Sequence, residues 1–271
     1  MRAMGWLILL ALAALTAFMT HPNWRRERMK PWRGRAFAHR GLHDPGTGIV
    51  ENTMAAFEAA CDAGYGIELD VQFSADQQVV VFHDDTLSRL CGDGRRVSAC
   101  GLAALRAKPL AGIDAARIPT LAEALALVAG RVPLLIELKT GPLNDRLCAA
   151  VLALLKDYPG EYMVQSFNPL IVGWFRRNAP QVVRGQLVCP MGNYIAQASR
   201  ISGLFMAGLM LNCIGRPDFV SYDANAPRFF THHFQRFFYR TPMAAWTIRT
   251  PEMARLIRRR GEICIFERIR P

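Results

Sequence analysis

Short strand-like runs alternate with helix-like segments from Arg35 onward in this 271-residue chain. Such alternation is typical of α/β proteins built on a parallel sheet, and it disfavours an all-β or an all-α class. The roughly 250 residues that follow a first apolar run match the usual size of a (β/α)8 TIM barrel. The runs with strand character are RAFAHR, GIELDVQF, VVVFHD, VPLLIELK, EYMVQSF, VVRGQLV, DFVSYD and MAAWTI. The sequence therefore predicts an α/β barrel.

Helix signals separate most of these runs. Asn52 is a credible N-cap for the segment that ends at Gly64, and Thr120 precedes an apolar-periodic run that ends at Gly130. Pro251 lies in the first turn of a last helix that ends in cations. These signals predict helices that connect the strands.

The residues from Met4 to Met19 are apolar and uncharged. As a helix this run would be about 24 Å long, which is at the short limit for a membrane span. Trp6 and the basic residues that follow could anchor its ends. We expect an uncleaved membrane anchor over 1–24, a basic linker over 25–34 and one folded domain over 35–271. A cleaved signal peptide is the alternative, although the tripeptide LTA is a poor cleavage site.

The formal net charge of the chain is +11. By the positive-inside rule, the basic residues after the apolar run place the folded domain in the cytoplasm, with export as the alternative. Seven scattered cysteines agree, since they lack the pattern of a disulfide framework. No nucleic-acid-binding module is recognisable, so membrane lipid with anionic headgroups is the partner that fits this charge better. A solvated basic face without a partner remains open.

Two strand-like runs are too close in sequence to be parallel neighbours. Between Phe73 and Val79 there is no room for the crossover that a parallel pair requires. We therefore expect a hairpin. A loop over 75–78 would place Asp70 opposite His83.

Three carboxylates lie in otherwise apolar strand-like runs. Glu68 and Asp70 are two residues apart and share a strand face, and Glu137 lies in another such run with Lys139 on its side of the pleat. Carboxylates without cysteine or clustered histidine ligands describe a hard, oxygen-rich site. We expect one divalent cation there, Ca²⁺ or Mg²⁺. Unrelated exposed carboxylates at strand ends are the alternative.

Two histidines follow strand-like runs at different points of the chain. His39 and His83 could supply a proton acceptor and a proton donor near neutral pH. Arg40 offers a fixed positive charge and a fork of donors for phosphate oxygens. Gly41 would let the backbone turn sharply away, and His43, beyond that turn, is a weaker candidate that could be exposed.

Six motifs, AHRG, ENT, ELD, VFHD, IELK and AWTI, occur in this order in the sequence. With them the chain resembles the glycerophosphodiester phosphodiesterases, most specifically from Ala38 to Asp85 and as far as Lys139. The resemblance implies a distorted TIM barrel, a divalent cation, and hydrolysis of a glycerophosphodiester to glycerol 3-phosphate and an alcohol. Carried over by motif, the roles are acid and base for His39 and His83, phosphate contact for Arg40 and Lys139, cation ligation for Glu68, Asp70 and Glu137, and a site carboxylate for Glu51.

The later part of the chain departs from the family pattern. The family's WTxN reads WTIR here, with Arg249 in place of asparagine. Arg249 could bind phosphate or face solvent, and Trp246 could form an apolar wall for the glycerol backbone or pack in the core. Apolar and aromatic segments over 188–218 and 227–240 could face lipid or be buried.

Several functions remain open from the sequence. The leading interpretation is a membrane-anchored, cation-dependent phosphodiesterase that takes a glycerophosphodiester or, if the apolar segments face lipid, a lysophospholipid. One alternative is a membrane-tethered phosphodiester-binding protein without turnover. Another is a phospholipase C-like lyase that releases a cyclic phosphate. The sequence does not indicate the oligomeric state.

Overall fold

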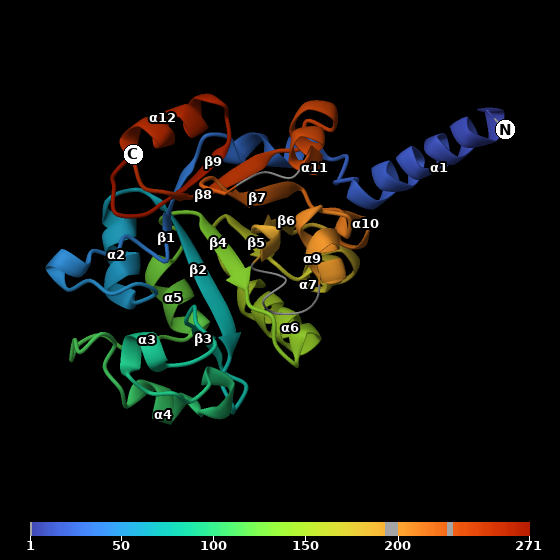
Figure 1. Ribbon diagram of the computed structural model, residues 1–271. Helices are drawn as coiled ribbons and strands as arrows, with labels where there is room; N and C mark the ends of the chain where they lie inside the picture. The colour runs from blue at the N-terminus through green and yellow to red at the C-terminus, as the bar shows by residue number, and fades with distance from the viewer. Residues whose placement is uncertain (1, 193–199, 227–229) are drawn as a thin grey trace.

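The computed structural model describes residues 2–192, 200–226 and 230–271, and its centre is a closed barrel of eight parallel strands (Figure 1). The ring follows chain order, and it closes because β1 pairs with both β2 and β9. The strands are β1 Ala36–His39, β2 Gly66–Phe73, β4 Leu134–Leu138, β5 Tyr162–Ser166, β6 Val183–Val188, β7 Phe219–Asp223, β8 Met243–Ile248 and β9 Ile263–Phe266. The predicted (β/α)8 barrel is confirmed.

One predicted run lies outside the ring and one barrel strand was missed. The run VVVFHD contributes only β3, Val79–Val81, which pairs antiparallel with the edge of β2. The eighth barrel strand is β9, which the sequence analysis did not predict. Its four apolar residues are too few to show a strand period, and its pairing with β1 and β8 defines it.

The predicted hairpin of β2 and β3 exists, but its predicted register is wrong by one residue. Phe73 pairs with Val79, and the Phe82 amide donates to the Asp70 carbonyl at 3.0 Å, so Phe82 takes the place expected for His83. The cause is a five-residue loop over 74–78, closed by hydrogen bonds between its first and last residues. His83 therefore lies beyond the end of the strand.

Side-chain caps start four of the helices that cover the barrel, α2, α5, α7 and α12. Thr53, and not Asn52 as predicted, caps α2 by accepting a hydrogen bond from the Ala56 amide. The predicted cap Thr120 is confirmed, within a capping box that includes Glu123. The helices between β1 and β9 include α2 Met54–Asp62, α3 Ser88–Cys91, α4 Leu102–Arg106, α5 Leu121–Val128, α6 Asn144–Leu155, α7 Pro169–Asn178 and α12 Pro251–Arg259.

A short helix closes the barrel at the amino ends of the strands. This 3-10 helix, η1 Arg26–Trp32, packs Met29 and Trp32 into an apolar cluster with Phe37 and Leu135. Met29 and Trp32 keep only 2% and 5% of their surface exposed. The apolar interior thus lies at this end, and the polar interior residues lie at the carboxyl ends of the strands, the usual end for TIM-barrel sites.

Helix α1, Arg2–Thr20, projects away from the barrel (Figure 1). Several hydrogen bonds hold its C-terminal end, among them those from the Tyr239 hydroxyl to the Ala17 carbonyl at 2.7 Å and from the Asn212 amide to the Thr20 carbonyl at 3.2 Å. Within the described residues, no helix is both long and apolar enough to cross a membrane, so the predicted transmembrane anchor is not supported.

The two late segments that were predicted to face lipid or the core are partly exposed. Between β6 and β7 lie α9 Arg200–Ala207, whose Ile201 is exposed, and α10 Asn212–Gly215. Between β7 and β8 lie α11 Phe230–His233 and the π-helix η4 Phe234–Phe238. The parts of these predictions that concern 193–199 and 227–229 lie outside the described residues.

Candidate active site

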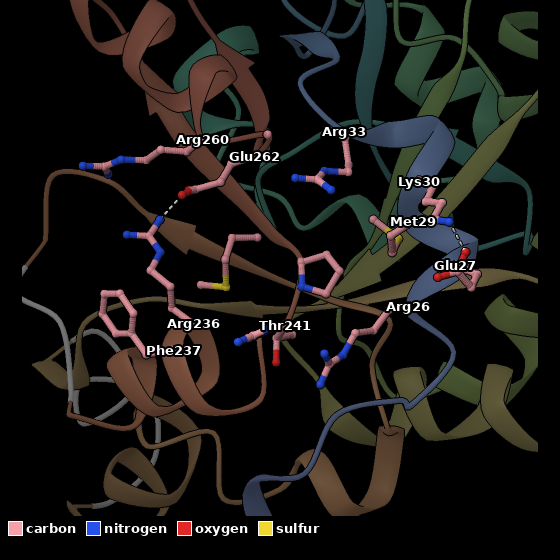
Figure 2. A pocket seen from close by; sticks show the side chains of 14 residues that line it. Arg26, Glu27, Met29, Lys30, Arg33, Arg236, Phe237, Thr241, Arg260 and Glu262 are labelled. Atoms are coloured by element: carbon pink, nitrogen blue, oxygen red, sulfur yellow. Dashed lines mark hydrogen bonds and ion pairs between the residues drawn. The ribbon is translucent and has the colours of Figure 1, made fainter.

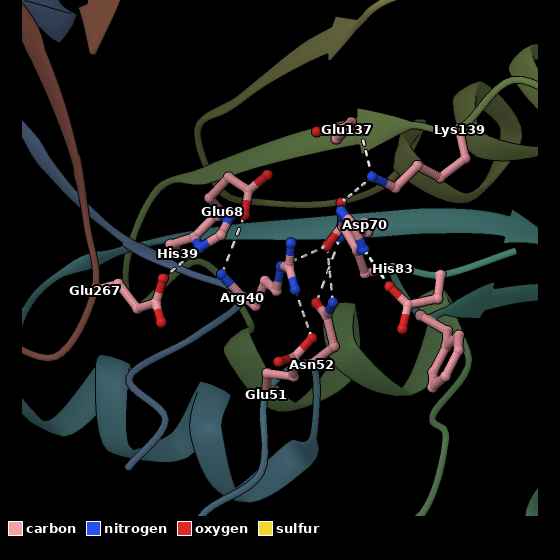
Figure 3. A network of polar contacts seen from close by, with 12 residues as sticks. His39, Arg40, Glu51, Asn52, Glu68, Asp70, His83, Glu137, Lys139 and Glu267 are labelled. Atoms are coloured by element: carbon pink, nitrogen blue, oxygen red, sulfur yellow. Dashed lines mark hydrogen bonds and ion pairs between the residues drawn. The ribbon is translucent and has the colours of Figure 1, made fainter. Parts of the chain in front are cut away.

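The first site residues lie where β1 ends and the chain reverses. His39 is the last residue of β1 and stands beside Glu68 of β2 in the parallel register. Arg40 and Gly41 then take φ values of +58° and +80°. A Cβ on Gly41 would lie 2.8 Å from the Ala56 Cβ, so this turn requires glycine. The turn predicted at Gly41 is confirmed, and it leaves Arg40 directed at the carboxylates of β2 (Figure 3).

The three predicted cation ligands come together at the mouth of the barrel. Glu68 and Asp70 share a face of β2, and Glu137 stands beside Asp70 on β4. Their exposed fractions are 2%, 1% and 6%, and one carboxylate oxygen from each lies within 4.8 Å of the other two. Three buried carboxylates this close repel one another unless cations neutralise them.

Two cationic side chains approach these carboxylates. The Lys139 Nζ lies 2.8 Å from Asp70 Oδ1 and 2.6 Å from Glu137 Oε1. The Arg40 Nε lies 3.6 Å from Asp70 Oδ2, and the Arg40 backbone amide donates to Glu68 Oε2 at 3.1 Å. Both predicted phosphate-contacting residues therefore lie at the predicted cation site.

These contacts set the pKa values of the carboxyl groups. Burial raises the pKa of Glu68 well above its usual value, and the charges of Asp70 and Glu137 raise it further. Burial acts on Asp70 as well, but the charge of Lys139, followed by those of other nearby cations, holds the pKa of Asp70 well below its usual value. The cations of the protein thus favour ionised Asp70 and leave the charge of Glu68 poorly balanced.

The donor set fits a hard divalent cation. Within the described residues, the group that could hold a metal consists of carboxylates alone, Glu68, Asp70 and Glu137. Oxygen ligands of this kind suit Ca²⁺ or Mg²⁺. A divalent cation would supply the positive charge that Glu68 lacks.

Asn52 is a site residue that sequence reasoning missed. Its amide donates to Asp70 Oδ2 at 2.8 Å, and the Asp70 backbone amide lies 3.4 Å from Asn52 Oδ1. A φ of +54° turns Asn52 out of the helical path, and Thr53 serves as the cap. The sequence did contain a signal for this role. Thr53, directly after Asn52, can also cap a helix, so the Asn52 side chain is not needed as the cap.

A chain of ion pairs links Arg40 to His83. Arg40 Nη1 donates to Glu51 at 2.7 Å, and Arg89 donates to both Glu51 oxygens at 2.9 and 2.7 Å. Arg89 Nε also donates to Asp84 at 2.6 Å, and Asp84 lies 2.6 Å from the His83 Nδ1. Burial lowers the pKa of His83, which favours its neutral form near pH 7. Figure 3 shows His83 beside Asp70.

His39 has a carboxylate partner that sequence reasoning also missed. Glu267 follows β9, and its Oε2 lies 3.5 Å from the His39 Nδ1. This contact with His39, together with Arg249, lowers the pKa of Glu267 to about 2. Burial lowers the pKa of His39, and Glu267 opposes that effect. Arg249, at the position where the family pattern has asparagine, donates to Glu267 at 2.8 Å.

Trp246 and His43, the remaining candidates from the sequence, have no hydrogen bond to the carboxylate cluster among the described residues. Trp246 lies edge-on to Phe167 at 6.0 Å between ring centroids, and no polar contact in the described part of the chain joins it to this network. His43 is buried with 9% exposure, whereas an exposed position was considered for it. Burial lowers the pKa of His43. Gln165 reaches the carboxylate cluster through a 3.4 Å hydrogen bond to Glu68.

The sequence model of the glycerophosphoryl diester phosphodiesterase family matches residues 39–267. The chain belongs to this family. The match begins at His39 and ends at Glu267, the two residues that meet across the first and last barrel strands. The resemblance inferred from the motifs is confirmed.

Individual relatives carry related names. A glycerophosphodiester phosphodiesterase of Caldanaerobacter subterraneus is 34% identical over 161 residues, which cover 55% of this chain and 65% of that protein. Glycerophosphodiester phosphodiesterase 1 of Rattus norvegicus is 31% identical over 161 residues, 55% of this chain and 47% of that protein. A lysophospholipase D of Rattus norvegicus is 30% identical over 193 residues, 65% of this chain and 56% of that protein. The chain thus matches less than two thirds of the length of each relative.

Solved structures support the same fold. A glycerophosphodiester phosphodiesterase of Thermotoga maritima has a TM-score of 0.64 at 26% identity and covers 85% of this chain and 93% of that one. An Oleispira antarctica phosphodiesterase, solved with the product sn-glycerol-3-phosphate, has a TM-score of 0.69 at 23% identity, with 88% and 94% covered. At 23% identity the second likeness concerns the barrel alone.

Proposed function

We propose that this protein hydrolyses glycerophosphodiesters to glycerol 3-phosphate and an alcohol with the help of one divalent cation. The observation that carries the proposal is the cluster of three buried carboxylates in contact with Arg40 and Lys139. His39 and His83 lie on either side of that cluster in Figure 3. Family membership and the names of the relatives agree with it.

The cationic residues account for phosphate binding. Glu68, Asp70 and Glu137 would hold the cation, which when bound polarises a phosphoryl group and lowers the pKa of a neighbouring hydroxyl or water. Arg40 and Lys139 balance the negative charge that builds on the phosphoryl oxygens. Both are already fixed in place by short contacts, so little reorganisation is needed when substrate binds.

The two histidines account for proton transfer. Burial lowers the pKa of both imidazoles, so each can accept a proton near pH 7. Glu267 and Asp84 would then stabilise the imidazolium form of His39 and of His83 respectively. One histidine, in its neutral form, takes a proton from the attacking hydroxyl or water, and the other, in its imidazolium form, gives a proton to the leaving alcohol.

Turnover of glycerophosphocholine tests the proposal against binding without catalysis. With Mg²⁺ or Ca²⁺ present, we expect the full chain to release choline and glycerol 3-phosphate. His39→Ala should lower kcat by about 100-fold or more while the protein stays folded by circular dichroism. The exposed His233 on α11 provides a matched control, and His233→Ala should keep kcat within about twofold. If glycerophosphocholine binds but is not hydrolysed with either ion, the protein is a phosphodiester-binding protein and the proposal of an enzyme is wrong.

Lysophospholipids are a second candidate substrate. The relative named lysophospholipase D motivates this candidate. Comparison of lysophosphatidylcholine with glycerophosphocholine under one cation decides between them. Hydrolysis of the lysolipid at a similar kcat/KM would extend the substrate class to acylated diesters.

The product decides between water and an internal nucleophile. If the neighbouring glycerol hydroxyl attacks, a cyclic phosphate forms first, as in phospholipase C-like lyases. Phosphorus NMR of the reaction distinguishes a cyclic phosphate from glycerol 3-phosphate. If the cyclic phosphate persists as the product, the protein is a lyase and not a hydrolase.

A further inference from the structure

Two cavities near the strand ends lie away from the candidate active site. One of about 680 Å³ opens at the amino ends of the strands, beside the first residues of β8 and β9 (Figure 2). It is lined by residues of η1, of η4 and the segment after it, and of the turn before β9. The cationic residues that line it are Arg26, Lys30, Arg33, Arg236, Arg240 and Arg260. We call this cavity the basic pocket.

The charges of the basic pocket are poorly balanced by the protein. Lys30 pairs with Glu27, and Arg236 pairs with Glu262. The other four cations of the lining have no carboxylate partner among the described residues. Figure 2 shows Arg26 and Arg33 on one side of the pocket and Arg260 on the other. A cleft lined by charges of one sign concentrates counter-ions, so this arrangement favours an anion.

A second basic cavity lies at the same end of the barrel. It has a volume of about 640 Å³, and Phe238 and Tyr239 line it. Asp218 pairs with two of its arginines, Arg28 at 3.3 Å and Arg184 at 3.7 Å. Its lining includes Arg25, Arg28, Arg176, Arg184 and Arg216, and no carboxylate from the described part of the chain. The basic surface is therefore wider than one small anion.

Apolar side chains surround the two basic cavities. Phe237 on the rim of the basic pocket is 71% exposed, and Phe238 beside the second cavity is 68% exposed. Ala17 and Phe18 of α1 line the second cavity as well. The large side chains of α1 that are more than half exposed are Met4, Trp6, Leu7, Ile8, Leu9, Leu10, Leu12, Leu15 and Phe18. A small soluble anion would leave this apolar surface in water.

We propose that this end of the barrel binds the surface of an anionic phospholipid bilayer, with headgroup phosphates in the basic pocket between Arg26, Arg33 and Arg260. Cations next to exposed aromatic and aliphatic side chains are the pattern of proteins that dock on such surfaces, because headgroups pair with the cations while lipid covers the apolar groups. The site is separate from the carboxylate cluster, which lies at the opposite ends of the strands.

Vesicle co-sedimentation of the full chain tests the proposal. The probes are vesicles of phosphatidylcholine alone and vesicles with 30 mol% phosphatidylglycerol, at about 0.1 M salt where charge attraction still acts. Because α1 could contact either vesicle, the readout is the ratio of the two affinities. Arg26→Glu with Arg33→Glu should lower that ratio by about 30-fold or more.

A matched double variant controls for the change in net charge. Arg117→Glu with Arg146→Glu alters the charge equally at residues outside both basic cavities and should leave the ratio within about threefold. If the first pair fails to fold by circular dichroism, Arg26→Gln with Arg33→Gln replaces it, with a loss of about tenfold expected. Equal affinity of the native protein for both vesicles would overturn the proposal. So would equal loss in the two double variants, or full displacement from vesicles by millimolar inorganic phosphate, which would indicate a site for a small anion only.

Discussion

The two ends of the barrel hold charged side chains in opposite ways. At the carboxyl ends, Asp70 and Glu137 are almost fully buried and lie in direct contact with Lys139. At the amino ends, Arg33 and Arg260 are exposed and have no carboxylate partner among the described residues. Breaking a buried pair leaves an uncompensated charge in a low-dielectric site, whereas an exposed cation contributes little to stability. The first arrangement fixes geometry for chemistry, and the second leaves its charge available to a partner.

Cation removal should have the largest effect, and it should act at the carboxyl end alone. After EDTA treatment and desalting, we expect turnover of glycerophosphocholine to fall by about 1,000-fold or more, because polarisation of the phosphoryl group is worth several kcal/mol. Added Mg²⁺ or Ca²⁺ should restore it. The ratio of vesicle affinities at the other end should not change. Full turnover in the chelated protein would show that the three carboxylates do not serve a catalytic cation.

Loss of the buried ammonium group of Lys139 should have the next largest effect. Lys139→Met removes the partner of Asp70 and Glu137, and the free energy of unfolding should fall by about 3–5 kcal/mol. Arg131 is the control, since its 2.7 Å pair with Glu58 joins two side chains that are 40% and 46% exposed. Arg131→Met should leave the free energy of unfolding in urea nearly unchanged, because water screens the exposed pair. Equal losses would remove the distinction between buried and exposed pairs.

The contact between His39 and Glu267 should appear in the pH dependence of turnover. Glu267 raises the pKa of His39 against the lowering effect of burial, so Glu267→Gln should lower that pKa further. His39 governs the acid limb of the profile of kcat/KM against pH if it accepts the proton, and the alkaline limb if it donates the proton. In either case this limb should move to lower pH. We also expect kcat to fall about tenfold, because the imidazole loses its orienting partner.

Arg249→Ala is the matched control for that variant. Arg249 also contacts Glu267, but its side chain is 53% exposed, so its charge is screened by water. The limb should move less than it does in Glu267→Gln. An upward shift of the limb in Glu267→Gln would contradict the proposed role of the carboxylate.

Local periodicity was enough to predict the centre of the site. Glu68 and Asp70 lie on one face because side chains alternate along a strand, and Glu137 stands beside Asp70 because β2 and β4 are parallel neighbours. Arg40 and His39 follow from the end of β1. The motifs that carried the family resemblance are these same positions, so the confirmed family and the predicted cluster rest on one set of residues.

The missed features depend on contacts between distant parts of the chain. Glu267 belongs to the site because β9 closes the ring against β1, and a four-residue run does not reveal that pairing. Asn52 was assigned to the helix cap because capping and carboxylate binding use the same side-chain amide. The hairpin register failed because the loop holds one residue more than assumed, and one residue shifts every pairing.

The smallest expected effect concerns turnover in the variant of the basic pocket. Arg26→Glu with Arg33→Glu should leave kcat/KM for glycerophosphocholine in solution within about twofold, because charges separated by more than about 8 Å of solvent are largely screened at physiological ionic strength. The two residues lie before β1, at the end of the barrel that Met29 and Trp32 close off from the carboxylates. Steady-state assays without vesicles measure this directly. A large loss of kcat/KM in a folded variant would mean that the two ends of the barrel are coupled, and the separation of a catalytic end from a lipid-binding end would no longer hold.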